Sequence, residues 1–233
     1  MSVIDDNLKQ LSDRINAACF RYSRNPDEIT LVGVSKTRGV DEIRQAFQAG
    51  LDHFGENKVQ EAETKIRQIG DGPVWHMIGH LQTNKAKKAV QLFDIIESVD
   101  SIKLAQALAE ECANTDIRLK ILLEVNSSGE TSKYGLKPEE VLTVAEEINN
   151  LDNLTLAGLM TIGPFTEELD AIDISFSMVQ ELYGQMRDKF GAEISTLSMG
   201  MTGDFERAIK YGSTELRIGT AIFGTRDYSI TEN

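Results

Sequence analysis

Short apolar segments alternate with amphipathic segments along the whole chain. The apolar segments are rich in Val, Ile and Leu and predict strands close to residues 28–36, 51–57, 73–81, 93–100, 119–126, 154–162, 194–200 and 214–224. Helices are predicted where apolar residues recur every three or four positions, over residues 3–19, 40–50, 57–69, 84–93, 101–113, 138–150, 166–191 and 204–212. After a leading helix, the chain therefore alternates strand and helix.

This alternation is typical of a parallel sheet with helices on its faces. Two architectures satisfy it, a doubly wound open sheet and a closed (β/α)8 barrel. About eight strands favour the barrel, and 233 residues are close to the roughly 250 that such a barrel needs. No linker divides the chain, so we predict an α/β fold with a single domain over residues 1–233, a (β/α)8 TIM barrel with an extra N-terminal helix.

The acidic composition limits the classes of partner. A net charge of -13 disfavours a general surface for nucleic acid or anionic membranes, but it permits a small anionic ligand in a local pocket. Cys19 and Cys112 lie far apart on apolar helical faces, which predicts buried free thiols. The N-terminus has no apolar signal region and no stretch approaches the roughly 18 apolar residues of a membrane span, so we expect a reduced, cytoplasmic protein.

Lys36 stands where an apolar strand ends, in the sequence LVGVSKT. The carboxyl ends of the strands form the active-site mouth of such barrels. Desolvation there lowers the pKa of a lysine, and a neutral amine attacks aldehydes to form a Schiff base. The alternative is a side chain that reaches solvent or pairs with a glutamate at a strand end, such as Glu56 or Glu124.

Two glycine-rich loops, SMGMTGD and RIGTAIFG, belong to the last two predicted strands. Barrels of this type often bind phosphate after strands seven and eight, where helix N-termini present free N–H groups. Gly200 and Gly203 permit a close approach of the backbone, and Thr202 is a candidate N-cap. Gly219 and Thr220 offer an amide and a hydroxyl. The alternative is a pair of tight turns that only cap helices.

A lysine and a phosphate site in one mouth favour either a phosphosugar aldolase or pyridoxal phosphate (PLP). Arg217 favours PLP, because an arginine that faces the pyridine nitrogen keeps that nitrogen unprotonated and weakens the ring as an electron sink. The alternative is a surface arginine paired with Glu215. A metal-dependent barrel is less favoured because His53, His76 and His80 are poorly grouped. We expect His53 to pack in the core and His80 to lie at the rim.

Several longer motifs resemble one known family. In chain order they are VSKT, HFGENKVQE, WHMIGHLQTNK, GLMTI, LSMGMTGDFERAI and GSTELRIGTAIFG. Together they closely resemble the pyridoxal phosphate homeostasis protein family. The resemblance extends from the first helix to the final FGTRDYS, and it implies a stand-alone relative of the alanine racemase N-terminal barrel (PLP fold type III) with PLP as its cofactor.

The resemblance implies a role for each matching residue. Lys36 would hold PLP as an internal aldimine, and Arg217 would face the pyridine nitrogen. Asn57 and His76 would line the cofactor ring. The phosphate would be held by Ser198, Met199, Gly200, Thr202, Gly219 and Thr220. Thr202 stands where the family often has serine, which keeps the hydroxyl, and SKYG at 132–135 stands where SKSG is frequent.

The resemblance further implies PLP binding without catalytic turnover. Such a protein would serve vitamin B6 homeostasis by buffering PLP or delivering it to apo-enzymes, with effects on amino-acid metabolism. We expect a monomer, with no second domain after the barrel to supply the tyrosine base of a racemase. The alternative is a low-activity amino-acid racemase that uses Lys36 and Tyr134, since we expect Tyr22, Tyr183 and Tyr211 to pack against helices.

Three lysines, Lys85, Lys87 and Lys88, follow the third predicted strand in the sequence NKAKKA. This pattern predicts a solvated helix face. A second, weaker phosphate site and a docking patch for acidic partners are the alternatives.

Overall fold

The β-strands pair in sequence order, and β8 pairs again with β1, so the parallel sheet closes into a barrel. The computed structural model describes residues 2–130 and 132–225. The strands are β1 (Thr30–Val34), β2 (His53–Glu56), β3 (Val74–Met77), β4 (Ile95–Val99), β5 (Leu119–Val125), β6 (Leu154–Thr161), β7 (Thr196–Ser198) and β8 (Glu215–Ile218). The predicted (β/α)8 barrel is confirmed. The end of the FGTRDYS motif, including Tyr228, lies outside the described residues.

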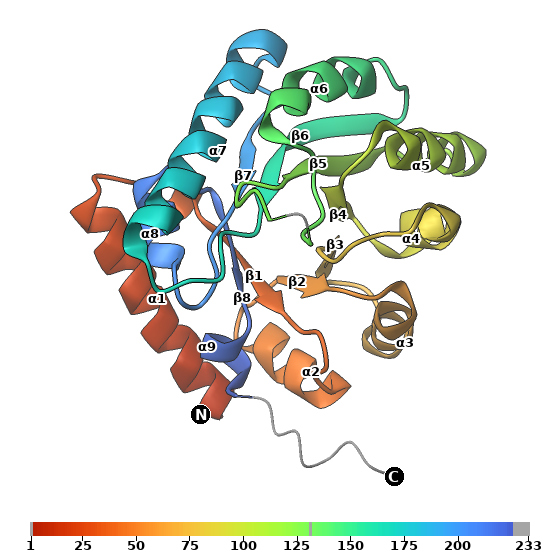
Figure 1. Ribbon diagram of the computed structural model, residues 1–233. Helices are drawn as coiled ribbons and strands as arrows, with labels where there is room; N and C mark the ends of the chain where they lie inside the picture. Colours follow the sequence, from red (N-terminus) through yellow and green to blue (C-terminus); the bar gives the residue numbers. More distant parts are fainter. Residues whose placement is uncertain (1, 131, 226–233) are drawn as a thin grey trace.

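Helices surround the barrel, as Figure 1 shows in a view along its axis. They are α1 (Val3–Arg21), α2 (Val40–Gln48), α3 (Val59–Ile69), α4 (Ala86–Leu92), α5 (Ile102–Thr115), α6 (Val141–Asn149), α7 (Leu169–Phe190), α8 (Phe205–Lys210) and α9 (Thr220–Phe223). Among the described residues, none of these helices has the length and apolarity that crossing a bilayer requires. The thiols of Cys19 and Cys112 are buried and free, as predicted.

The apolar core lies mainly between the strands and the helices. Ile121 and Leu123 of β5 belong to this outer core, whereas Leu122 between them belongs to a separate small cluster with Ala157 and Met160. Because side chains alternate along a strand, this small cluster lies inside the barrel. The rest of the interior is lined largely by polar side chains, and these form the candidate site described below.

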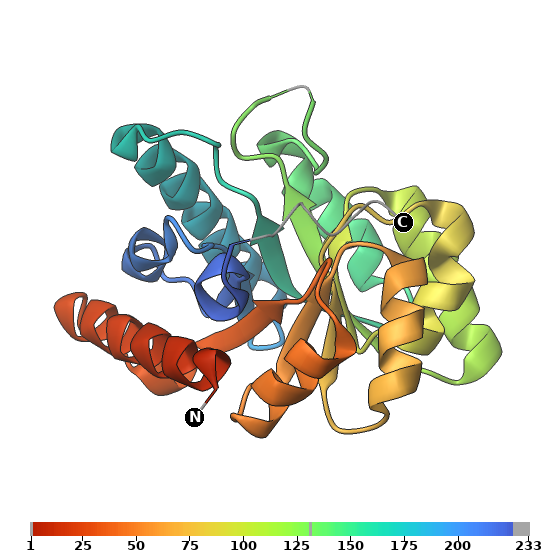
Figure 2. The same ribbon diagram turned by 90° about the horizontal axis from the view of Figure 1, so that it is seen from below.

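The leading helix α1 packs beside α8 and α9, on the side of the barrel away from α4 and α5 (Figures 1 and 2). Ser2 starts the helix with a capping box, because its hydroxyl accepts a hydrogen bond from the Asp5 amide and the Asp5 carboxylate accepts one from the Ser2 amide. The Asn7 side-chain amide donates to the Ile222 carbonyl in α9 over 2.9 Å. The extra helix therefore packs against α9, the short helix that follows the last strand.

The last predicted strand was too long. Residues 214–224 were predicted as one strand, but β8 ends at Ile218 and Thr220 begins the short helix α9. The apolar residues of TAIF are needed here to cover the outside of the barrel, where Ile222 and Phe223 are buried in the main core. A short apolar run does not distinguish a buried strand from a buried helix.

Candidate cofactor site

Lys36 lies half-buried two residues after the end of β1, at the carboxyl end of the barrel. Gly33 of this strand faces the outer core, where the Leu51 side chain lies beside it. Alternation therefore turns Val34 and Lys36 toward the barrel interior. The expected strand-end position of the lysine is confirmed.

One of the two expected partners of Lys36 is engaged elsewhere. The Glu56 carboxylate accepts hydrogen bonds from Lys65 Nζ at 2.7 Å and from the Ser35 hydroxyl at 2.6 Å. Burial raises the pKa of Glu56, and the Lys65 ammonium opposes this shift. The other expected partner, Glu124, is also buried, and desolvation followed by repulsion from Asp100 raises its pKa to about 7.

The two glycine-rich loops meet at the same end of the barrel. The Thr202 hydroxyl in the loop after β7 accepts a hydrogen bond from the Ala221 amide at the start of α9, over 3.4 Å. Within the described part of the chain, the backbone N–H groups of Gly200, Thr202, Gly203 and Gly219 have no hydrogen-bond partner. Several unpaired N–H groups close together form a place where an anion can be bound.

The loop after β7 depends on the conformation of Gly200 and on the side chain of Asp204. Gly200 has a φ of +100°, and an added Cβ atom would lie 2.6 Å from the Ala208 Cβ. The expectation that Thr202 caps α8 is wrong, because Asp204 occupies the N-cap position. The Asp204 carboxylate accepts a hydrogen bond from the Met201 amide over 2.6 Å, which keeps that oxygen turned onto the loop backbone.

Arg217 is a buried residue, only 3% exposed, and not a surface arginine. Its guanidinium donates to the Ser198 hydroxyl at 2.6 Å and to the Thr161 carbonyl at 2.7 Å. The Glu97 carboxylate lies 3.7 Å from the same guanidinium and supplies its counter-charge. Strands β4, β6 and β7 thus fix this side chain in one orientation.

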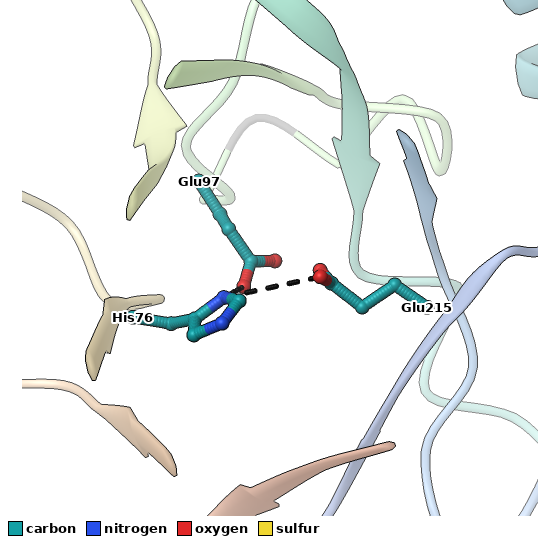
Figure 3. Close-up of side chains that lie close together, drawn as sticks. All are labelled: His76, Glu97 and Glu215. Atoms are coloured by element: carbon teal, nitrogen blue, oxygen red, sulfur yellow. Dashed lines mark hydrogen bonds and ion pairs between the residues drawn. The ribbon is translucent and has the colours of Figure 1, made fainter. Parts of the chain in front are cut away.

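Three titratable side chains from β3, β4 and β8 meet inside the barrel (Figure 3). His76 Nδ1 lies 2.7 Å from a Glu97 oxygen and 3.9 Å from a Glu215 oxygen. Desolvation raises the pKa of Glu97, and it raises the pKa of Glu215 to about 7 with a further contribution from the nearby Glu97 charge. The buried carboxyls of Glu97 and Glu215 therefore both lie in the field of one cation, the Arg217 guanidinium.

A hydrogen-bonded row extends from this cluster across the barrel interior. His53 Nδ1 and His76 Nε2 are 2.9 Å apart, and the Ser198 hydroxyl donates to Glu97 over 2.6 Å. Desolvation lowers the pKa of both histidines. The two nitrogens of His76 therefore connect His53 on one side with Glu97 on the other. His53 packs edge-on against the His76 ring, with a centroid distance of 5.2 Å, and is hydrogen-bonded to it as well.

The structure changes the expected roles of Ser198 and His76. The Ser198 side chain, expected at the phosphate, is fully buried between Glu97 and Arg217. The His76 ring, expected beside the cofactor ring, is fully buried and is hydrogen-bonded at both nitrogens. Both side chains thus support Arg217 from within the barrel, directly or through Glu97.

Asn57 lies half-buried directly after β2, next to Gly79. Its side-chain oxygen is buried and has no hydrogen-bond partner within the described residues. It lines a hollow at the mouth together with His80 and Lys85. An unsatisfied buried acceptor at this place is available to a ligand.

The rim of the mouth carries an aromatic pair. The rings of His80 and Tyr134 stack with a centroid distance of 3.7 Å, and His80 also contacts Asp100 at 3.1 Å. The rim position of His80 is confirmed. Lys88 forms an ion pair with Glu63, which accords with the solvated face predicted for the lysine cluster.

The cluster of His76, Glu97 and Glu215 also has the ligand types of a metal site. The sequence gives no signal of this grouping, because Glu97 and Glu215 lie far from the histidines in the chain. Arg217 already places a fixed positive charge beside Glu97, and a second cation there would be repelled. We therefore interpret the cluster as support for the arginine.

Two residues of this region, Lys65 and Glu97, lie in none of the motifs. Three others, Glu56, Thr161 and Glu215, lie within motifs but were not assigned to the site. The available signal was a charged residue inside an apolar strand segment, as in DIIESV and TELRIG. Charges in such positions are rare unless they are paired.

Comparisons with known proteins agree with this geometry. Residues 7–227 match the family described as "Alanine racemase, N-terminal domain". A "Pyridoxal phosphate homeostasis protein" of Haemophilus influenzae is 42% identical, with 99% of this chain and 99% of the relative covered. PipY of Synechococcus elongatus PCC7942, solved with PLP bound, has a TM-score of 0.83 and 32% identity, with 95% of this chain and 100% of PipY covered. An alanine racemase of Clostridium difficile 630 shares the fold, with a TM-score of 0.77 and 15% identity over 96% of this chain and 58% of the racemase.

The closed barrel is that of the alanine racemase N-terminal domain class. The chain belongs to the pyridoxal phosphate homeostasis protein family. The resemblance read from its motifs is confirmed.

The site residues fit PLP on structural grounds. A half-buried lysine, a fixed guanidinium and a group of unpaired backbone N–H groups lie at the same end of the barrel. They match, in order, the aldehyde, the pyridine nitrogen and the phosphate of the cofactor.

Proposed function

We propose that this protein binds PLP through Lys36 and acts in vitamin B6 homeostasis by buffering the cofactor or passing it to apo-enzymes. The observation that carries the proposal is the fixed Arg217 guanidinium beneath a mouth that also holds Lys36 and the unpaired N–H groups. The names of the relatives and the PLP in PipY support the same cofactor.

The reaction at Lys36 is reversible. Lys36 would hold the aldehyde of PLP through its amine, and the amine–aldehyde chemistry that the cofactor supplies is reversed by water, so loading and release would use the same residue. A protein that stores a reactive aldehyde needs this reversibility more than it needs any later chemistry.

Arg217 supports storage over catalysis. Its guanidinium is held in place by Ser198, Thr161 and Glu97. A fixed cation beside the pyridine nitrogen disfavours protonation of that nitrogen, which limits the electron-sink chemistry that PLP supplies when bound.

We propose that no catalytic turnover accompanies binding. A racemase needs a second base opposite the lysine, and among the described tyrosines only Tyr134 lines the mouth. The Tyr183 hydroxyl donates to the Ile194 carbonyl, while Tyr22 and Tyr211 pack against the core, as predicted. Tyr134 is 57% exposed at the rim. A low-activity racemase that uses Tyr134 is the second candidate, and exchange of the substrate α-proton in deuterated water would reveal it.

The same proposal includes the remaining roles of the PLP site. Thr202, Gly219 and Thr220, with the backbone of Met199 and Gly200, hold the phosphate. Asn57 contacts the cofactor through its unsatisfied oxygen. We further propose that the protein is a cytoplasmic monomer with one domain over residues 1–233.

Titration with PLP tests the proposal. The wild-type protein should develop a visible absorption band that saturates at one equivalent per chain, and Lys36→Ala should not develop it. Lys87→Ala removes an exposed lysine of α4 and is the matched control that should behave as wild type. Saturation of Lys36→Ala with the same band would refute the role of Lys36.

A further inference from the structure

The residue before Lys36 is held by a buried lysine from another element. Lys65 of α3 is 6% exposed, and its Nζ donates to the Ser35 carbonyl over 2.7 Å. The same Nζ donates to Glu56 over 2.7 Å and to Glu61 over 2.6 Å. An ammonium group has three N–H donors, so this lysine is saturated.

The residue after Lys36 is held by the same cluster. The Thr37 amide donates to a Glu61 oxygen over 2.5 Å, and this oxygen also accepts from Lys65. On the other side, the Ser35 hydroxyl donates to the Glu56 oxygen that accepts from Lys65. Ser35 and Thr37, on either side of Lys36, are therefore each hydrogen-bonded to a carboxylate that also accepts from Lys65.

The backbone conformation at this turn is intrinsically unfavourable and needs support from neighbouring groups. Thr37 has a φ of +64°, a region that β-branched residues avoid. Backbone strain of this kind persists only where the surroundings enforce it, and it is concentrated at functional sites. Here the enforcing group is the Glu61 carboxylate, which is itself fixed by Lys65.

We propose that Lys65 is a positioning residue for the PLP-binding lysine. It joins Glu56 and Glu61 into a clamp on Ser35 and Thr37, and this clamp fixes the point from which the Lys36 side chain enters the mouth. Lys65 itself does not react with the aldehyde, because its amine is buried and its three donors are occupied. The inference rests on the proposed function in one respect, that Lys36 is the reacting amine.

The test uses variants that remove the clamp without leaving a lone buried charge. Lys65→Met alone would strand the buried Glu56 carboxylate and threaten folding. The double variant Glu56→Gln/Lys65→Met removes both charges. Glu61→Gln is a milder second variant, because the Glu61 side chain is 28% exposed. Arg67→Met is the control, since it removes an exposed cation from the same helix α3.

Two readouts are measured on each folded variant. The first is amide hydrogen exchange of residues 35–38 in the protein freed of PLP, which does not depend on cofactor binding. The second is the rate of PLP uptake, with the visible circular dichroism of the bound cofactor as a report of its fixed orientation. We expect exchange at Thr37 to become faster and PLP uptake to slow by about tenfold or more, because misplacing a reacting group by 1 Å can cost about a hundredfold.

The outcomes separate the two proposals. Faster exchange with slower uptake and a weaker dichroism band, in variants that unfold cooperatively, supports the clamp. Unchanged exchange and unchanged uptake in Glu61→Gln or in the double variant overturns it, even if wild type binds PLP normally. Failure of wild type itself to take up PLP would refute the proposed function, while the exchange result would still decide whether Lys65 fixes the turn.

Discussion

Two glutamates inside the barrel set the electrostatics beneath the mouth. Glu97 is bonded to His76 and Ser198 and lies beside Arg217, whereas Glu215 contributes a second carboxyl to the same buried space. A single guanidinium does not easily neutralise two buried carboxylates. Desolvation, followed by repulsion from the nearby Glu97 charge, raises the pKa of Glu215 to about 7.

This pKa makes folding stability depend on pH. The carboxyl of Glu215 is protonated up to about pH 7 in the folded protein but only to about pH 4.5 when unfolded, so the folded state binds more protons between these values. The free energy of unfolding should therefore fall as the pH rises from 4.5 to 7. A shift of this size corresponds to up to about 3 kcal/mol.

The variant Glu215→Gln isolates the contribution of Glu215 to the pH dependence of the free energy of unfolding. Urea unfolding at pH 5 and at pH 8 should show a smaller loss of unfolding free energy in the variant than in wild type. Equal losses in the two proteins would mean that Glu215 is already ionised at pH 5. Glu206→Gln, at an exposed residue of α8 paired with Arg14, is the control and should retain the wild-type dependence.

The loops after β7 and β8 depend on glycine for their geometry. Gly200 combines a φ of +100° with close contact to Ala208 of α8, whereas an added Cβ at Gly203 would meet no atom within 4 Å. A side chain is therefore excluded at Gly200 but has space at Gly203, although both residues present unpaired N–H groups.

Gly200→Ala should destabilise the protein by about 1–3 kcal/mol, the usual cost of a strained backbone. It should also weaken binding of PLP, because the loop that presents the N–H groups must shift. Gly203→Ala is the matched control and should leave the unfolding midpoint and PLP affinity close to wild type. Similar effects of both substitutions would show that the close contact at Gly200 is unimportant.

The order and type of the barrel elements could be predicted from the sequence, because each strand is a separate apolar segment and each helix shows a clear period. The position of Lys36 followed from the strand end alone. The helix α9 was missed because TAIF is apolar without a period that separates strand from helix. The buried carboxylates were missed because their partners come from other strands, and Ser198 was misplaced because its two partners lie on β4 and β8.

The whole barrel combines a conventional outer core with a polar interior. The outer core between strands and helices supplies most of the apolar burial, and β5 and β6 contribute a small apolar cluster inside the barrel. The polar interior is connected by hydrogen bonds from His53 to Arg217. A ligand that contacts Arg217 would extend this network.

Binding of PLP should raise the melting temperature of the whole domain. A ligand at 100 times its Kd stabilises the folded state by about 2.7 kcal/mol. For a domain of this size, that corresponds to a rise of roughly 5–10 °C. Pyridoxal without the phosphate should give a much smaller rise at the same concentration, and an equal rise would refute the assignment of the glycine-rich loops as the phosphate site.

The most direct test of the account is to locate the covalent bond. The purified protein would be loaded with PLP, reduced with borohydride and digested, and its peptides would be mapped by mass spectrometry. We expect one phosphopyridoxyl group, attached to Lys36. A label on Lys65, on the exposed lysines of α4, or on no lysine at all would contradict it.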